Sequence, residues 1–139
     1  MTTKTYSTTT KEVTAEQLWK LMSNVDGWKR WDAGTEDSKL NGAFATGSSF
    51  MLKPKGGPKL TIELLEVKAP TYFKDVTKFP LAKMYDEHSY EQTADGLKIT
   101  STLTMTGPLG FFWNMVVMKN IVENLPKDIA TQIAEAKNL

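Results

Sequence analysis

The sequence predicts an α+β domain in which a curved antiparallel sheet of seven strands wraps around one long C-terminal helix. Two observations support this fold class. Over residues 37–106 apolar and polar side chains alternate and turn residues recur about every ten positions, as in an antiparallel meander. Over residues 107–139 apolar side chains instead recur at the spacing of an amphipathic helix. The apolar face of that helix needs a partner surface, and the sheet supplies one, with a pocket between the two.

Composition limits the classes of protein to consider. With 139 residues, the chain is expected to form a single domain, residues 1–139. Its 17 basic and 16 acidic residues give a net charge of +1 without long runs of one sign, so neither nucleic acid nor an anionic membrane is expected as a partner. There is no cysteine, no signal-like N-terminus and no apolar run of roughly twenty residues. We therefore expect a cytoplasmic protein.

The N-terminal part predicts a strand followed by a short helix. Residues 4–10 are rich in threonine and lack a helical period, which favours a strand. Thr14 and Gln17 have the spacing of a capping box, and Val13 and Leu18 have that of a hydrophobic staple. A helix is therefore expected to begin at this point.

A second short helical turn is expected around Trp28 and Trp31, because two indoles three residues apart lie on one side of a turn. Residues 32–34 then break the chain. Large aromatic side chains usually fill the core, and we favour that interpretation. In the alternative, one of the two rings forms a wall of the pocket.

Six further strands are expected at residues 37–41, 48–53, 60–67, 72–78, 84–93 and 97–106. A two-residue turn at Asp95-Gly96 would close the last hairpin and pair Tyr90 with Ser101. Cross-strand partners share a face, so Asp86, His88 and Tyr90 are predicted to line the concave surface beneath the helix. A loop longer by one residue would reverse this and place the opposite face of the strand inside, with Tyr85, Glu87 and Ser89.

The C-terminal helix is expected to begin at Gly107-Pro108, with proline at the first helical position. A kink or break is expected at Pro126, which cannot donate to the carbonyl of Val122. The predicted buried stripe comprises Phe111, Met115, Met118, Val122, Leu125, Ile129, Ile133 and Ala136.

The first half of this helix is also apolar on its other side, at Trp113, Val116 and Val117. Something besides the sheet is therefore expected to cover it. The segment from Trp28 to Gly34 and a second subunit are the two alternatives, so both a monomer and a homodimer stay open.

The order of these elements resembles the START-like (SRPBCC) superfamily with its Bet v 1-like helix-grip fold. Four segments carry the resemblance to its polyketide cyclase/dehydrase branch, at residues 15–32, 47–50, 66–70 and 95–110. None of them is a catalytic signature. The resemblance implies a scaffold shared by aromatase/cyclases, lipid carriers and hormone receptors.

Reactive side chains are few. His88 is the only histidine, and without cysteine the sequence predicts no metal site and no cofactor. No nucleophile with an evident base is found, which argues against a hydrolase triad. His88 is a possible general acid or base, with Asp86 or Tyr90 orienting it. The favoured interpretation is that these polar groups orient a bound molecule.

The predicted function is the binding of a small hydrophobic or aromatic molecule, lipid-like or polyketide-like, between sheet and helix. Cyclase or dehydratase chemistry through His88 is one alternative, and a protein-interaction module like the co-chaperone branch is another. The predicted lining residues are Trp28, Trp31, Phe50, Leu52, Ile62, Phe73, Ser101, Leu103, Met105, Phe112, Met115, Met118 and Val122.

Overall fold

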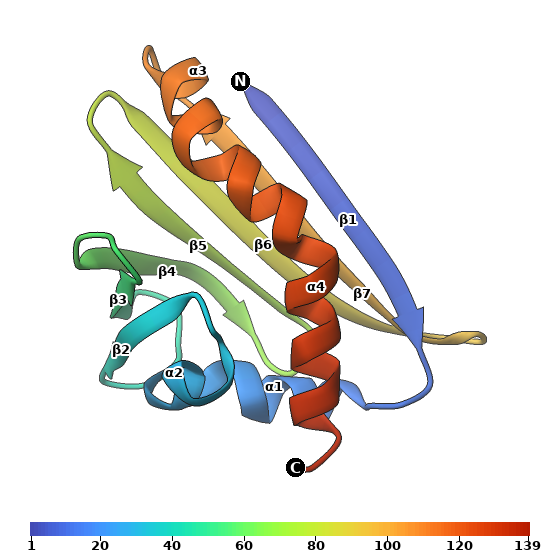
Figure 1. The fold of residues 1–139 in the computed structure, drawn as a ribbon. Coiled ribbons are helices and arrows are strands. Elements are labelled where there is room, and N and C mark those ends of the chain that lie inside the picture. The colour runs from blue at the N-terminus through green and yellow to red at the C-terminus, as the bar shows by residue number, and fades with distance from the viewer.

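A computed structural model describes all 139 residues and confirms the predicted fold class. Seven strands form one antiparallel sheet in the order β1-β7-β6-β5-β4-β3-β2, and the C-terminal helix lies across one face of it (Figure 1). The strands are β1 (Thr2–Thr10), β2 (Thr35–Asn41), β3 (Ser49–Pro54), β4 (Leu60–Lys68), β5 (Tyr72–Phe79), β6 (Ala82–Thr93) and β7 (Gly96–Thr106). Every predicted strand is present, and only the strand ends differ from expectation.

The helical elements lie in two groups along the chain. They are α1 (Ala15–Ser23), the 3-10 turn η1 (Val25–Gly27), α2 (Trp28–Trp31), α3 (Gly110–Trp113), the π-helical turn η2 (Asn114–Met118) and α4 (Lys119–Ala136). The first group connects β1 and β2, which lie at opposite edges of the sheet. None of these helices combines the length and the apolarity needed to cross a membrane.

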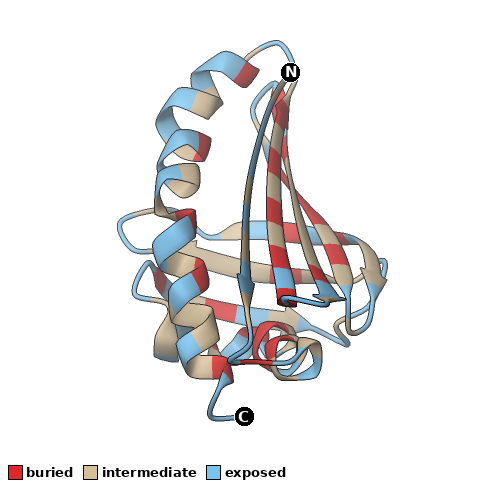
Figure 2. Ribbon diagram, turned by 90° about the vertical axis from the view of Figure 1, so that its right-hand side faces the viewer, coloured by how far each residue is buried: buried red, intermediate tan, exposed pale blue.

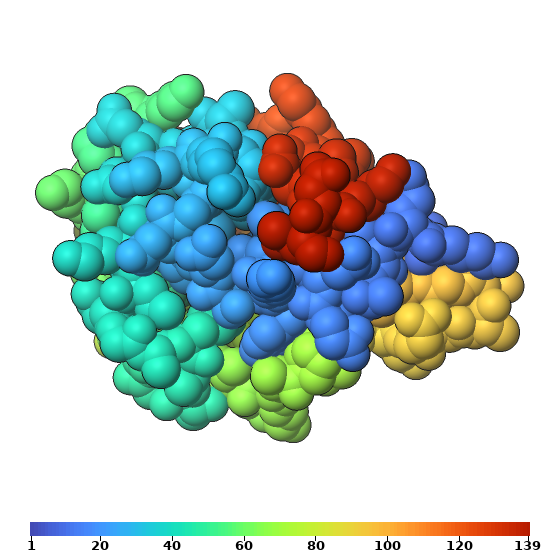
Figure 3. Space-filling model, turned by 90° about the horizontal axis from the view of Figure 1, so that it is seen from below, coloured from blue at the N-terminus to red at the C-terminus, as the bar shows by residue number.

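The predicted capping box of α1 is present. The backbone N–H of Gln17 donates to Thr14 Oγ1 at 3.2 Å, and the backbone N–H of Thr14 donates to Gln17 Oε1 at 2.8 Å. Gln17 also donates through Nε2 to the backbone oxygen of Leu139 at 3.1 Å. Helix α1 thus packs beside the end of α4, and together they close one end of the molecule (Figure 3).

Trp28 fills the core, as the favoured interpretation predicts. Its ring meets that of Phe50 edge to face at 5.2 Å between centroids, and its Nε1 donates to the backbone oxygen of Met22 at 3.0 Å. Trp31 is half-buried and packs against the same cluster. The segment that carries both rings lies at the opposite end of the molecule from α3 (Figure 1), so it does not cover the start of the C-terminal helix.

The C-terminal helix begins at Gly110, two residues later than the predicted first helical residue, Pro108. Gly107 has a φ of 105°, which is a left-handed conformation, and a side chain there would meet the backbone oxygen of Leu81 at 2.5 Å. The backbone N–H of Leu109 then donates to the same Leu81 oxygen at 3.0 Å. The chain is therefore tied to the β5–β6 turn before the first helical residue.

The predicted buried stripe is wrong in its first two positions. Phe111 and Met115 are 70% and 62% exposed, while Gly110 is buried and Asn114 is half-buried. The reason is the π-helical turn η2, which has about one more residue per turn than an α-helix. It therefore moves the inward-facing positions that precede Met118 back by one residue along the chain. From Met118 onward the predicted stripe packs inward, and its Met118, Leu125, Ile129 and Ala136 are buried.

Of the kink or break expected at Pro126, the break does not occur, although the helix axis changes direction near its middle (Figure 1). Helix α4 runs without interruption from Lys119 to Ala136, with Pro126 on its exposed side. Water can satisfy a backbone carbonyl that proline leaves without a donor on an exposed helix face. The helix therefore runs alongside the sheet as one element, from the top to the bottom of the view in Figure 2.

Candidate functional site

The β6–β7 hairpin places the predicted polar residues on the concave face, but in a different register. Its two loop residues are Ala94 and Asp95, and Thr93 pairs with Gly96. His88 therefore lies opposite Ser101, where the Asp95-Gly96 turn would have placed Tyr90. The register is shifted by two residues, and a shift of two keeps every side chain on its predicted face.

The face of the sheet beneath the helix carries two separate apolar clusters. One includes Phe73, Tyr90 and Ile99, and it extends to α1 and the end of α4. The other includes Leu103 and Met118, and it packs below the start of the helix. Between them, Asp75 on β5, Asp86 and His88 on β6, and Ser101 on β7 form a polar belt across three neighbouring strands.

Three ionisable side chains of this belt converge. The distance from His88 Nε2 to Asp86 Oδ2 is 3.1 Å, and Asp75 lies directly opposite Asp86 in the β5–β6 pairing. One side-chain donor atom from each of the three residues lies within 4.8 Å of the others. The ring of Phe73 stacks on the imidazole of His88 with centroids 4.3 Å apart and planes 17° apart, which holds the imidazole in place.

Two buried polar atoms at this site have no hydrogen-bond partner, namely Asp86 Oδ1 and the hydroxyl of Tyr90. Tyr90 is 2% exposed and lies two residues beyond His88 on the same face of β6. A buried polar group without a partner destabilises the folded chain by about 1 to 3 kcal/mol. The unpaired atoms therefore mark a place where another molecule or ion would add stability.

The electrostatics of the site raise three pKa values. Burial and the charge of Asp86 hold the pKa of Asp75 well above its usual range. Burial alone would lower the pKa of His88, but attraction to Asp86 and Asp75 outweighs it, so the pKa of His88 is raised. Burial, and then the charge of Asp86, raises the pKa of the Tyr90 hydroxyl. Asp75 and His88 thus favour their protonated forms, and Tyr90 keeps its hydroxyl proton.

The predicted lining residues fall into three groups by burial. Buried beneath the helix or at the closed end are Trp28, Phe50, Ile62, Phe73, Ser101, Leu103, Met105 and Met118. Half-buried are Trp31, Leu52 and Val122. The remaining two, Phe112 and Met115, are 42% and 62% exposed and lie near the start of the C-terminal helix.

Asp75 is the site residue that sequence reasoning did not find. The turn after Phe79 carries the signal for it, because a two-residue loop at Pro80-Leu81 pairs Phe79 with Ala82 and therefore Asp75 with Asp86. The absence of a metal site was inferred from the histidine and cysteine counts alone. With Asp75 included, the site has three possible ligands to a cation.

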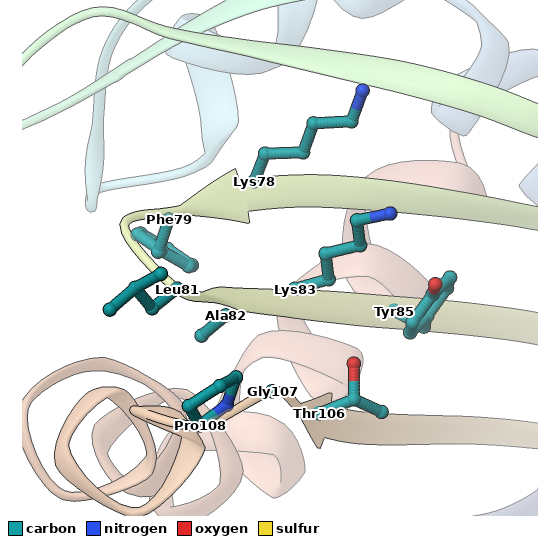
Figure 4. A pocket seen from close by; sticks show the side chains of 9 residues that line it. All are labelled: Lys78, Phe79, Leu81, Ala82, Lys83, Tyr85, Thr106, Gly107 and Pro108. Atoms are coloured by element: carbon teal, nitrogen blue, oxygen red, sulfur yellow. The ribbon is translucent and has the colours of Figure 1, made fainter.

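Among the hollows of the molecule are two at turns of the sheet, and neither of these two includes a predicted lining residue. One, with a volume of about 450 Å³, is an open depression around the β5–β6 turn (Figure 4). The residues that line it include Lys78, Lys83, Tyr85 and Gly107. The other, of about 290 Å³, lies at the β6–β7 turn beside Thr14.

A seven-stranded antiparallel sheet gripping a long C-terminal helix over a partly polar concave face is the helix-grip fold of the START-like (SRPBCC) superfamily. The profile of the family described as polyketide cyclase/dehydrase and lipid transport matches residues 1–135, and the chain belongs to that family. No curated protein sequence matches the chain.

Solved structures of distant sequence share this fold. A hypothetical protein of Helicobacter pylori, jhp0584, is similar with a TM-score of 0.76 and 9% identity, over 97% of this chain and 88% of that one. Ara h 8.0201 is similar with a TM-score of 0.71 and 12% identity, over 99% of this chain and 100% of that one. The di-domain aromatase/cyclase BexL is similar with a TM-score of 0.68 and 10% identity, over 98% of this chain and 49% of that one.

Proposed function

We propose that this protein binds a small hydrophobic or aromatic molecule between the concave face of the sheet and the C-terminal helix. One observation carries the proposal, namely the two buried atoms without partners, Asp86 Oδ1 and the Tyr90 hydroxyl. A ligand that combines an apolar body with one polar group would pair with these atoms and lie against the apolar clusters on either side. Family membership supports this class of ligand.

Entry is expected at the start of the helix. The segment α3–η2 is held to the β5–β6 turn mainly by Trp113, whose ring stacks on Phe79 at 4.8 Å and whose Nε1 donates to the Pro80 oxygen at 2.9 Å. Phe112 and Met115 are already exposed beside it. Displacement of this segment would admit an apolar molecule to the Leu103 side of the polar belt.

Binding can be tested with a panel of fatty acids, sterols and aromatic polyketides in native mass spectrometry and titration calorimetry. Tyr90→Phe removes only the unpaired hydroxyl and is expected to weaken the binding of a hit by about fivefold, since one hydrogen bond contributes roughly 1 kcal/mol. Tyr85→Phe is the matched control, because Tyr85 lies on the opposite face of the same strand. If no compound binds, or if both variants bind equally well, the proposal is wrong.

A second candidate function is cyclase or dehydratase catalysis by His88. The 3.1 Å contact with Asp86 favours it, because a carboxylate at this distance orients an imidazole and stabilises its charged form. His88→Ala should then abolish the turnover of a bound polyketide while binding is largely kept. Unchanged turnover in this variant would remove the acid/base role and leave the binding function.

A further inference from the structure

We propose that Asp75, Asp86 and His88 form a binding site for one divalent transition-metal ion, of the class that includes Zn²⁺ and Co²⁺. The three side chains come from two paired strands, with Asp75 opposite Asp86 and His88 two residues further along β6. The ion would lie on the concave face between the two apolar clusters. This inference does not rest on the proposed ligand-binding function.

The spacing of the donor atoms supports the site. Two atoms that each bind a zinc ion at about 2.0 to 2.2 Å lie roughly 3 to 3.5 Å apart. His88 Nε2 and Asp86 Oδ2 are 3.1 Å apart, so they already have the separation of two ligands to one ion. The third donor, from Asp75, lies within 4.8 Å of both.

Burial and the missing hydrogen bonds are the second line of support. Asp75 is 6% exposed, so its carboxylate is almost removed from water. The hydroxyl of Tyr90, which is 2% exposed, has no partner, and Tyr90 lies two residues beyond His88 on the same face of β6. Oxygen Oδ1 of Asp86 also has no partner. A cation, with a water molecule bound to it, would supply a partner to each of these atoms.

Charge explains why the occupant would be a cation. Two carboxylates lie in a belt whose neighbours on both sides are apolar, where like charges repel strongly. A proton on His88 neutralises only one of them. A divalent ion neutralises both and leaves His88 free to bind as the neutral imidazole, which Phe73 holds by stacking.

The donor set indicates which ions would bind. Two carboxylate oxygens and one imidazole nitrogen suit first-row transition ions better than Mg²⁺ or Ca²⁺, which prefer oxygen ligands alone. Among these ions, Zn²⁺ and Co²⁺ are expected to bind more tightly than Mn²⁺. Three protein ligands also leave at least one coordination position open, as in zinc sites that bind a further molecule.

The test uses the full chain after treatment with a chelator, with ZnCl₂ as the probe and no organic ligand present. Because His88 is the only histidine, its imidazole gives a single set of NMR signals. We expect Zn²⁺ to shift that set until one ion per chain is bound, and calorimetry to give the same stoichiometry. Co²⁺ should give a visible absorption band, and MgCl₂ at the same concentration should change nothing.

Variants locate the ion. Asp75→Asn and His88→Gln should each weaken Zn²⁺ binding at least tenfold, whereas Asp95→Asn, which alters an exposed carboxylate in the β6–β7 turn, should leave it unchanged. A thermal unfolding scan of each variant checks that it is folded.

Absence of any His88 shift at millimolar Zn²⁺ would overturn the proposal, and so would equal binding by Asp75→Asn and the unaltered chain. Either result would leave the ligand-binding proposal standing, because that proposal is tested with organic compounds and Tyr90→Phe.

Discussion

The buried carboxyl group of Asp75 occupies a position that is unfavourable for the stability of the folded chain. Its carboxyl group is buried on β5 opposite a second carboxylate, Asp86, and no basic side chain other than His88 acts on it. Burial of a charge without a full set of partners is unfavourable, and proteins retain such groups mainly where they bind something. If the site binds a ligand or an ion as proposed, it lowers stability in return for binding, as many functional sites do.

Replacement of Asp75 by asparagine should stabilise the protein at pH 8 in the presence of a chelator. The change removes a buried negative charge and keeps the size of the side chain, and we expect a gain on the order of 1 to 3 kcal/mol. Chemical denaturation followed by circular dichroism measures it. Asp95→Asn, in an exposed turn, should change stability by less than about 0.5 kcal/mol. A destabilised Asp75→Asn would mean that the carboxylate has partners which stabilise it.

Sequence reasoning at this scale found three of the four residues of the polar belt, Asp86, His88 and Ser101. The alternation of β6 assigns Asp86, His88 and Tyr90 to one face correctly, because a period of two survives a register error of two. It could not supply Asp75 without the β5–β6 pairing, which depends on the length of the turn after Phe79. The alternation also does not predict the 3.1 Å contact between His88 and Asp86, because that contact depends on the side-chain conformations of two residues on one strand.

At the scale of elements, the helix start is where periodicity and structure disagree. A constant 100° per residue predicts that Phe111 and Met115 face the sheet, but the π-helical turn from Asn114 to Met118 rotates them to the outside. Strand positions, the capping box of α1 and the second half of the helix follow local patterns, so the sequence sufficed for them. The segment before the π turn instead makes contacts with residues distant in sequence, those of Trp113 with Phe79 and Pro80, which a constant period does not include.

Trp113 is expected to be the main anchor of the helix start. Trp113→Ala should destabilise the protein by roughly 2 to 3 kcal/mol, less than a fully buried tryptophan, because its ring is half-buried against Phe79. Hydrogen exchange should become faster in η2 while α1 and the end of α4 keep their protection. Met115→Ala is the control, because an exposed side chain two residues further along the helix should change stability by under about 0.5 kcal/mol. Equal effects of the two variants would mean that the stacked ring does not hold this segment.

The whole molecule is built as two apolar clusters joined by one helix and separated by one polar belt. Leu125 and Ile129 of α4 belong to different clusters, so the helix connects the halves that the belt divides. The cluster that contains Ile129 also includes Trp28 and residues of α1. The cluster that contains Leu125 lies toward the start of the helix, where apolar side chains such as Phe111 are exposed. Because the belt contains the titrating groups of the core, its protonation couples to the stability of the entire fold.

The coupling between protonation of the polar belt and stability predicts how the free energy of unfolding depends on pH when a chelator is present. The raised pKa values of Asp75 and His88 mean that the folded chain binds more protons than the unfolded chain, whose corresponding pKa values are about 3.9 and 6.5. The free energy of unfolding must therefore fall as pH rises from about 4 through the raised pKa of each group. Asp128, whose pKa is raised by partial burial and by Asp32, contributes with the same sign.

Denaturation between pH 5 and pH 9 measures this dependence, and the single histidine signal reports the pKa of His88 directly. The stabilisation contributed by His88 should be complete below about pH 6.5 and lost as pH rises through its raised pKa. Asp75→Asn should lower that pKa, since the charge of Asp75 is one of its causes, and should make the stability curve flatter. A stability that rises from pH 5 to pH 9 would contradict the coupling, because it requires the unfolded chain to bind more protons than the folded one.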